Sequence, residues 1–315
     1  MKDRQPPNAS EYTKWLKDKA NLELTIADAR MGIPAYERHS IISQIPTSLS
    51  LTRAGLTLFK NNTYTPPFDP RIFENISMWY DGADRNSMTI NASSRLTQWN
   101  DKSGKGYNLA TSIGGPTITS SSNAVGYDIV FNGGQNLKNV TMSPAISTTQ
   151  FTYFIVFVNK PSETNAYGRF ISASNVNSDN TDANSLCITS YNLANPNKVF
   201  FIIGTNNASV PTVFADTYTI ASFVWSSPTA NVFINGAPVT GTSSSNTLAF
   251  SKFGIGATPN NDSNRLGNGS VVNEFVSFTS ALTPNQRQQI EGYLAWKWGL
   301  QASLPSNHPY FNVKP

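Results

Sequence analysis

Charge, histidine and cysteine are all scarce in this sequence, and each shortage excludes a class of protein. Only 13% of the 315 residues are charged, and the net charge of +4 is spread along the chain without a basic block. Direct nucleic-acid binding is therefore not expected. The two histidines, His39 and His308, stand 269 residues apart without neighbouring ligand residues, so no zinc site is predicted.

The chain has one cysteine and no long apolar run. Cys187 lies between Leu186 and Ile188 in a strand-like segment, so we expect a buried structural thiol. A single cysteine forms no intramolecular disulfide, which suits a reducing compartment. The N-terminal residues MKDRQPPNASEY lack the apolar core of a signal peptide, and no segment approaches the length of a membrane span. We expect neither secretion nor membrane insertion.

Short apolar runs separated by Gly, Asn, Pro and Ser fill the chain from residue 71 to residue 315. This pattern predicts an antiparallel β-sandwich with at least eleven strands. The segment 151–159 is almost wholly apolar, so it should be buried on both faces. Asn235-Gly236 joins two apolar runs and predicts a hairpin. The expected strands are 76–81, 96–99, 127–131, 151–159, 169–173, 186–191, 199–204, 218–225, 231–235, 253–256 and 271–278.

One short helix is expected after the last strand, over residues 284–298. Thr283 is a good N-cap, Pro284 suits the first helical position, and Gly299 suits the end. Apolar residues recur at helical spacing from Ile290 to Trp296, which indicates a helix that docks on the sandwich.

Residues 1–70 differ in composition and are predicted to form an N-terminal arm. An amphipathic helix is expected over about residues 9–24, followed by an extended segment that holds five prolines. The apolar stripe of this helix either packs on its own domain or binds another subunit. The candidate partner-binding residues are Tyr12, Trp15, Leu16 and Leu24.

Several motifs together resemble the concanavalin A-like, laminin-G-like jelly-roll family over about residues 72–310. They are SMWYDGAD (77–84), QWNDKSGKGYNLA (98–110), YDIVFNGGQNL (127–137) and the closing NEFVSFTSALTPNQRQQIEGYLAWKWGL (273–300). The closing stretch with its LPSNHPY tail looks similar to jelly-roll proteins encoded by large DNA viruses. The resemblance implies a jelly-roll sandwich, with the loop at Asp101 packed around Trp99.

Four acidic residues in loops are candidates for calcium, which takes oxygen ligands from irregular backbone. The alternative is that they stabilise turns by bonding nearby backbone amides. These residues are Asp81, Asp84, Asp101 and Asp262. No other cofactor is expected.

Aromatic residues beside polar amides would suit a glycan-binding groove, whereas their usual place in a sandwich is the core. The candidates are Tyr107, Tyr167, Tyr191 and Trp225.

The function expected from the sequence is structural rather than enzymatic. Sandwich enzymes of this type cleave glycans with paired acids, often in a Glu-x-Asp-x-x-Glu strand, and none of the seven glutamates belongs to such a motif. The resemblance implies a minor capsid protein of a large DNA virus. It would be made in the host cytoplasm, located in the virion and bound to other capsid proteins. The alternative is a lectin-like module that binds host glycans.

Overall fold

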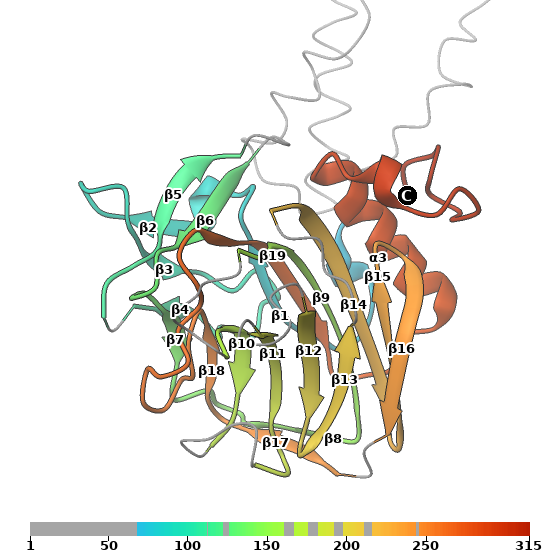
Figure 1. The fold of residues 1–315 in the computed structure, drawn as a ribbon, viewed down its shortest axis with the longest axis horizontal. Coiled ribbons are helices and arrows are strands. Elements are labelled where there is room, and N and C mark those ends of the chain that lie inside the picture. Colours follow the sequence, from blue (N-terminus) through green and yellow to red (C-terminus); the bar gives the residue numbers. More distant parts are fainter. Residues whose placement is uncertain are drawn as a thin grey trace, which may run out of the picture. The chain divides into compact units, whose positions relative to one another are not determined.

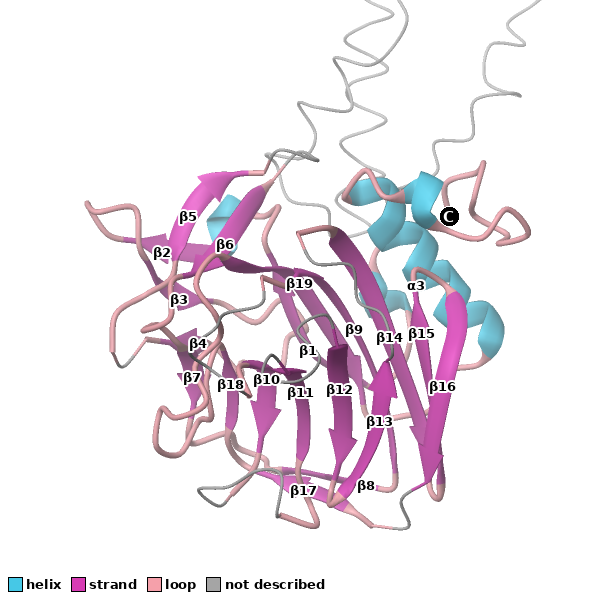
Figure 2. Ribbon diagram, viewed as in Figure 1, coloured by secondary structure: helices cyan, strands magenta, loops and turns pink. Residues whose placement is uncertain are grey.

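The computed structural model describes residues 68–111, 113–121, 126–160, 167–175, 182–191, 198–210, 216–243 and 246–315. These residues form two antiparallel β-sheets packed face to face, with one α-helix against the outer face of one sheet (Figure 1; Figure 2). The predicted all-β sandwich is thereby confirmed. The helix predicted over residues 9–24, with Tyr12, Trp15, Leu16 and Leu24, lies outside the described residues.

In the described part of the chain, the first sheet has eight strands in the order β16-β15-β14-β9-β19-β6-β5, and β1 pairs with the far half of β19. All of its pairs are antiparallel. Its strands are β1 (Ile76–Asp81), β5 (Thr117–Ser120), β6 (Tyr127–Phe131), β9 (Gln150–Val158), β14 (Tyr218–Ser226), β15 (Thr229–Ile234), β16 (Ala237–Ser243) and β19 (Ser270–Phe278).

The second sheet has nine strands among the described residues, in the order β13-β12-β11-β10-β18-β7-β4-β3-β2. They are β2 (Met88–Ile90), β3 (Leu96–Trp99), β4 (Leu109–Ala110), β7 (Leu137–Asn139), β10 (Arg169–Ala173), β11 (Leu186–Tyr191), β12 (Lys198–Ile203), β13 (Asn206–Val210) and β18 (Phe253–Ile255). A separate pair joins β8 (Ile146–Thr148) to β17 (Leu248–Phe250). Short 3-10 helices cover Pro70–Ile72, Arg85–Ser87 and Gln301–Ser303.

Strand β9 is buried on both faces, as its apolar sequence predicted. Phe151, Tyr153 and Phe157 point into the core between the sheets. Phe154 and Val156 point the other way, into a second apolar cluster beneath helix α3. Successive side chains of a strand alternate between faces, so a strand with core on both sides needs apolar residues throughout.

Two local predictions are also confirmed. Asn235 and Gly236 join β15 to β16 with φ angles of 49° and 80°, the left-handed values that a two-residue hairpin of this kind requires. Cys187 is a buried thiol in β11 and forms no disulfide.

Helix α3 (Pro284–Lys297) closes the described fold. Thr283 and Gln286 form a capping box, and Pro284 takes the first turn. The helix ends before Gly299, whose φ is 67°. Its buried face packs on the outer cluster of the first sheet through Ile290, Leu294 and Ala295. The predicted closing helix is confirmed, and it ends one residue earlier than expected.

Candidate functional site

The segment from Asn100 to Asn108, here called loop 100–108, is organised by the carboxylate of Asp101. Its Oδ1 accepts the backbone N–H groups of Trp79 and Ser103 at 3.0 and 2.9 Å. Its Oδ2 accepts the Ser103 hydroxyl and the Tyr107 N–H at 2.8 and 3.1 Å. A carboxylate acceptor makes each of these hydrogen bonds stronger than a neutral one.

The same loop covers the outer edge of β1. Lys102 N–H donates to the Trp79 carbonyl at 2.8 Å, and the Ser103 hydroxyl donates to the Ser77 carbonyl at 3.1 Å. These contacts occupy backbone groups that an edge strand would otherwise expose. In loop 100–108, the Lys102 side chain lies near helix α3, and Lys105 and Tyr107 line a pocket.

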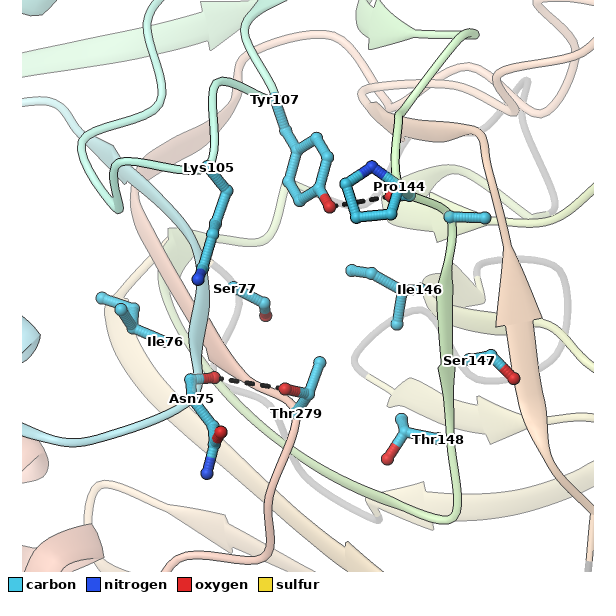
Figure 3. A pocket seen from close by; sticks show the side chains of 11 residues that line it. Asn75, Ile76, Ser77, Lys105, Tyr107, Pro144, Ile146, Ser147, Thr148 and Thr279 are labelled. Carbon is cyan, nitrogen blue, oxygen red and sulfur yellow. Dashed lines mark hydrogen bonds between the residues drawn. The ribbon is translucent and has the colours of Figure 1, made fainter.

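That pocket, called the Tyr107 pocket below, has a volume of about 460 Å³. It lies between loop 100–108, the start of β1, the end of β19 and strand β8 (Figure 3). The Tyr107 hydroxyl donates to the Pro144 carbonyl at 2.8 Å, and Thr279 N–H donates to the Asn75 carbonyl at 2.9 Å. These two contacts join the segments that form its walls. The lining residues are Asn75, Ile76, Ser77, Lys105, Tyr107, Pro144, Ala145, Ile146, Ser147, Thr148 and Thr279.

Three polar side chains of the Tyr107 pocket are unengaged. The amide of Asn75, the ammonium group of Lys105 and the hydroxyl of Ser147 make no hydrogen bond or ion pair within the described part of the chain. By contrast, Thr148 donates to the Gln150 carbonyl at 2.7 Å. The ammonium group of Lys105 faces the pocket, whereas the Ser147 side chain lies on the opposite face of β8 from Ile146 and Thr148 (Figure 3).

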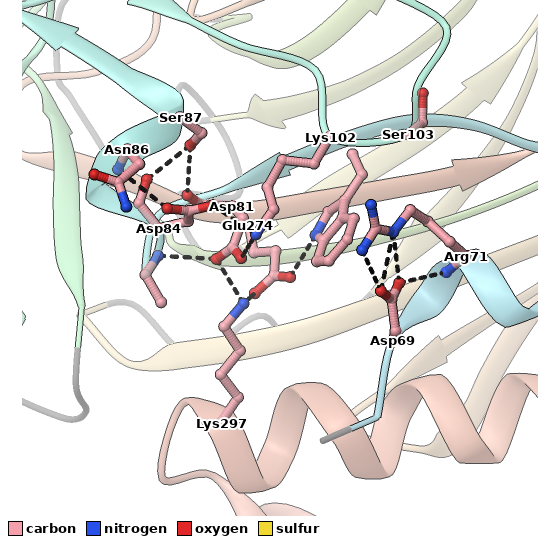
Figure 4. A network of polar contacts seen from close by, with 12 residues as sticks. Asp69, Arg71, Asp81, Asp84, Asn86, Ser87, Lys102, Ser103, Glu274 and Lys297 are labelled. Carbon is pink, nitrogen blue, oxygen red and sulfur yellow. Dashed lines mark hydrogen bonds and ion pairs between the residues drawn. The ribbon is translucent and has the colours of Figure 1, made fainter. Parts of the chain in front are cut away.

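On its other side, loop 100–108 contributes Lys102 to a buried charge network at the C-terminal end of helix α3 (Figure 4). Lys297 Nζ lies 2.5 Å from Asp81 Oδ1 and 2.8 Å from Glu274 Oε2. Lys102 Nζ lies 2.8 Å from Asp81 Oδ2 and 2.8 Å from Asp84 Oδ2. Asp81 and Glu274 are cross-strand partners in β1 and β19, so one lysine from the helix reaches both.

Aromatic donors complete the shell around the Glu274 carboxylate. It accepts Trp79 Nε1–H at 2.9 Å, Trp298 Nε1–H at 2.7 Å and the Tyr293 hydroxyl at 3.0 Å. Lys102 Nζ also lies 4.3 Å from the centre of the Trp79 ring, within cation–π range. This network fastens helix α3 to the first sheet.

Burial and the two lysines set the protonation of the network. Burial raises the pKa of Asp81, but the charges of Lys297 and Lys102 outweigh it and lower that pKa to about 2. For Glu274, burial dominates and raises the pKa, and the charge of Asp81 adds to the effect. Asp81 is therefore ionised at neutral pH and paired with both lysines.

A second buried acid fastens the middle of helix α3 and the C-terminal tail. Glu291 is paired with Arg287 and lies 3.3 Å from His308 Nε2, and it accepts the Ser222 hydroxyl at 2.7 Å. His308 is thus a buried packing residue of the tail.

The structure places the four calcium candidates in structural contacts. Asp81 and Asp84 face lysines, and Asp101 accepts hydrogen bonds from its own loop. Asp262 lies elsewhere, 2.6 Å from Lys138 Nζ. No group of three or more His, Cys, Asp or Glu residues suited to a metal occurs among the described residues.

The four glycan candidates do not form one groove. Trp225 is 0% exposed in the core between the sheets, so it cannot stack on a sugar, and its prediction as a glycan-binding residue is wrong. Tyr167 is 47% exposed, whereas Tyr107 is 5% exposed and lines the pocket. The backbone of Tyr191 belongs to β11, and its side chain lies outside the described ones.

Sequence reasoning did not identify Lys105, Lys297 or Glu274 as site residues. Glu274 interrupts the apolar run VVNEFVSF, and a charged residue inside such a run was the one available signal of a buried partner. Lys297 and Lys102 gave no comparable signal, because their acidic partners come from distant segments.

Comparisons with known proteins give a likeness of fold. No protein-family model and no curated protein matches the sequence. The binding domain of Paraclostridial Mosquitocidal Protein 1 is similar with a TM-score of 0.50 and 12% identity, over 73% of this chain and 56% of that chain. Another similar structure is domain 4 of AbnA, a GH43 extracellular arabinanase from Geobacillus stearothermophilus, solved with arabinotriose. Its TM-score is 0.47 and its identity 15%, over 67% of this chain and 96% of that chain. A third is a botulinum neurotoxin type C structure, solved in work on its ganglioside-dependent cell entry. Its TM-score is 0.48 and its identity 11%, over 70% of this chain and 51% of that chain.

Within the described ranges, no helix has the length and apolar character needed to cross a membrane.

Proposed function

We propose that the sandwich is a non-catalytic carbohydrate-binding module and that its site is the Tyr107 pocket. The observation that supports this proposal most is the lining of the pocket. It combines an aromatic edge and an aliphatic wall with the unengaged groups of Asn75 and Lys105. Saccharides present both apolar ring faces and many hydroxyl groups, so a site of this mixed character suits them.

The size of the pocket fits a small saccharide unit. Its volume of about 460 Å³ falls within the roughly 300–1,000 Å³ typical of ligand pockets. At 12% identity, the likeness to the mosquitocidal binding domain concerns the fold alone. Function depends on the site rather than on the fold, so the pocket is the basis of the proposal.

Binding without turnover is proposed because no carboxyl group lines the pocket. The common glycosidase mechanisms need two carboxyl groups flanking the scissile bond, as acid and as nucleophile or base. The buried acids Asp81 and Glu274 are held by Lys297 beneath helix α3 and do not line the Tyr107 pocket.

A glycan array probed with the full chain, with and without calcium, tests the proposal. We expect binding in at least one condition, loss of that binding in Thr148→Trp, which places a bulky side chain in the pocket, and retention in Ser120→Trp. Ser120 is an exposed residue of β5 and serves as the matched control. Silence of the whole array, or unchanged binding by Thr148→Trp, would contradict the proposal.

The role in virion assembly stays a prediction from the sequence resemblance. It rests on the likeness of the closing stretch to viral jelly-roll proteins. The contacts expected for it include residues 1–70, nearly all of which lie outside the described residues. The features of the sandwich described above favour ligand binding over that role.

A further inference from the structure

Lys105 is the one charged residue among the residues that line the Tyr107 pocket. No aspartate or glutamate is among the lining residues, and Lys105 makes no ion pair within the described part of the chain. Its ammonium group points toward the pocket beside Ser77 (Figure 3). The pocket therefore has positive charge and no compensating acid.

The neighbouring lysine of the same loop shows the contrast. Lys102 lies 2.8 Å from both Asp81 and Asp84, so its charge is already matched inside the protein. Gly104 and Gly106, with φ angles of 88° and 79°, turn the loop between Lys102 and Tyr107. The turn separates a lysine used for structure from a lysine that faces the pocket.

The groups around Lys105 favour an anion that is also rich in hydroxyls. The Asn75 amide both donates and accepts hydrogen bonds, so it suits the hydroxyl groups of a saccharide. A lysine is a compact point charge that binds a carboxylate or a sulfate through strong, charge-assisted hydrogen bonds. A neutral sugar would gain only a hydrogen bond from Lys105, whereas an anionic sugar would also gain the attraction of opposite charges.

We infer that the Tyr107 pocket selects saccharides that carry a carboxylate or sulfate group, with Lys105 as the residue that binds the anion. This inference rests on the carbohydrate-binding function proposed above and names its ligand class. Preference for a charged ligand should weaken with added salt, because Lys105 is exposed and its interactions are screened.

Isothermal titration of the full chain with matched saccharides tests the inference. The probes are sialyllactose and sulfated lactose against lactose, and oligogalacturonate against its methyl ester. We expect at least one charged probe to bind about tenfold more tightly than its neutral counterpart, as a charge-assisted contact implies. The carboxylate and sulfate arms show which anion the pocket prefers.

Three variants assign the preference to Lys105. In Lys105→Gln the ratio of charged to neutral affinity should fall to within about twofold of one, and Lys105→Arg should restore most of it. Lys160→Gln is the matched control, because Lys160 is a half-exposed lysine that pairs with Asp216 away from the pocket. It should keep the wild-type ratio.

The outcomes separate this inference from the proposed function. Equal affinity for charged and neutral probes would overturn the inference and leave carbohydrate binding intact. A preference that persists in Lys105→Gln would also overturn it, because another group would then bind the anion. If none of the probes binds and the glycan array is silent as well, the proposed function fails and the inference fails with it.

Discussion

Asp81 is the residue at which strand β1, loop 100–108 and helix α3 meet. Its carboxylate is 4% exposed and is held between Lys102 and Lys297. A buried ion pair of this kind adds little net stability compared with apolar packing, but removing one partner leaves the other charge buried without compensation. The cost of losing Asp81 should therefore be much larger than the cost of losing a surface acid.

Asp81→Asn should lower the free energy of unfolding by about 3 kcal/mol or more, measured by urea denaturation. The matched control is Asp216→Asn, whose ion pair with Lys160 has side chains 66% and 46% exposed. That variant should stay within about 0.5 kcal/mol of wild type. Equal losses in the two variants would show that the Asp81 network does not fasten the helix.

The lowered pKa of Asp81 predicts a defined loss of stability in acid. Its folded-state pKa of about 2 lies below the ordinary value of 3.8, so the unfolded chain takes up this proton first as the pH falls. The contribution, roughly 2 kcal/mol, is complete above about pH 4 and is lost as the pH falls through about 2. Unfolding free energies of wild type and Asp81→Asn should converge over this window.

The raised pKa of Glu274 affects stability in the opposite direction to the lowered pKa of Asp81, and over a different pH range. Its contribution is greatest below the ordinary pKa of 4.5 and declines as the pH rises through the folded-state value. If the difference in unfolding free energy between wild type and Asp81→Asn stays constant from pH 4 to pH 2, the account of Asp81 is contradicted.

At the scale of elements, helix α3 depends on its first turn as well as on its apolar face. The Thr283 hydroxyl accepts the Gln286 N–H, and the Gln286 side chain accepts the Thr283 N–H. These bonds satisfy N–H groups that have no partner inside the helix. The apolar face of α3 and its cap therefore stabilise the fold separately.

Thr283→Ala should cost about 1 kcal/mol of unfolding free energy, because it removes the cap hydroxyl. Thr283→Ser keeps that hydroxyl and should lose less than half as much. Urea denaturation of the two variants and wild type measures the difference. A loss in Thr283→Ser as large as that in Thr283→Ala would rule out the capping bond as the cause.

Local sequence patterns predicted most of the long strands and helix α3, whereas the short strands depend on tertiary contacts. The apolar run of β9, the Asn235-Gly236 hairpin and the caps of α3 carry their own signals. Strands such as β4 (Leu109–Ala110) have two or three residues and are specified by pairing, so no periodic pattern reveals them.

The site was predictable only in part, for a related reason. Tyr107 was identified as a glycan candidate and does line a pocket, but Trp225 lies in the core. An aromatic residue in a sandwich has the same local signature in either place. The difference between Lys102, which is paired, and Lys105, which is not, depends on acids that loop 100–108 meets only in the folded protein.

At the scale of the whole molecule, the sequence predicts an arm over residues 1–70 and a sandwich over residues 71–315. Brief trypsin digestion should cut among the nine Lys and Arg residues of the first 70 and leave a resistant fragment that retains helix α3. Mass spectrometry of the fragments identifies the cuts. Early cleavage within residues 216–243 or 246–315 would contradict this division, because buried strands must unfold before they are cut.

The predicted partners of the arm remain other capsid proteins, and the predicted location remains the virion. Deletion of residues 1–60 followed by measurement of incorporation into particles tests both predictions. Unchanged incorporation would remove the arm from any account of assembly.

The most direct test of the central claim is an experimental structure of the full chain bound to the saccharide that it binds most tightly. The account predicts a saccharide in the Tyr107 pocket, with an anionic group within hydrogen-bond distance of Lys105 Nζ, at about 2.7–3.2 Å. A saccharide bound on another face of the sandwich, with the Tyr107 pocket unoccupied, would contradict it.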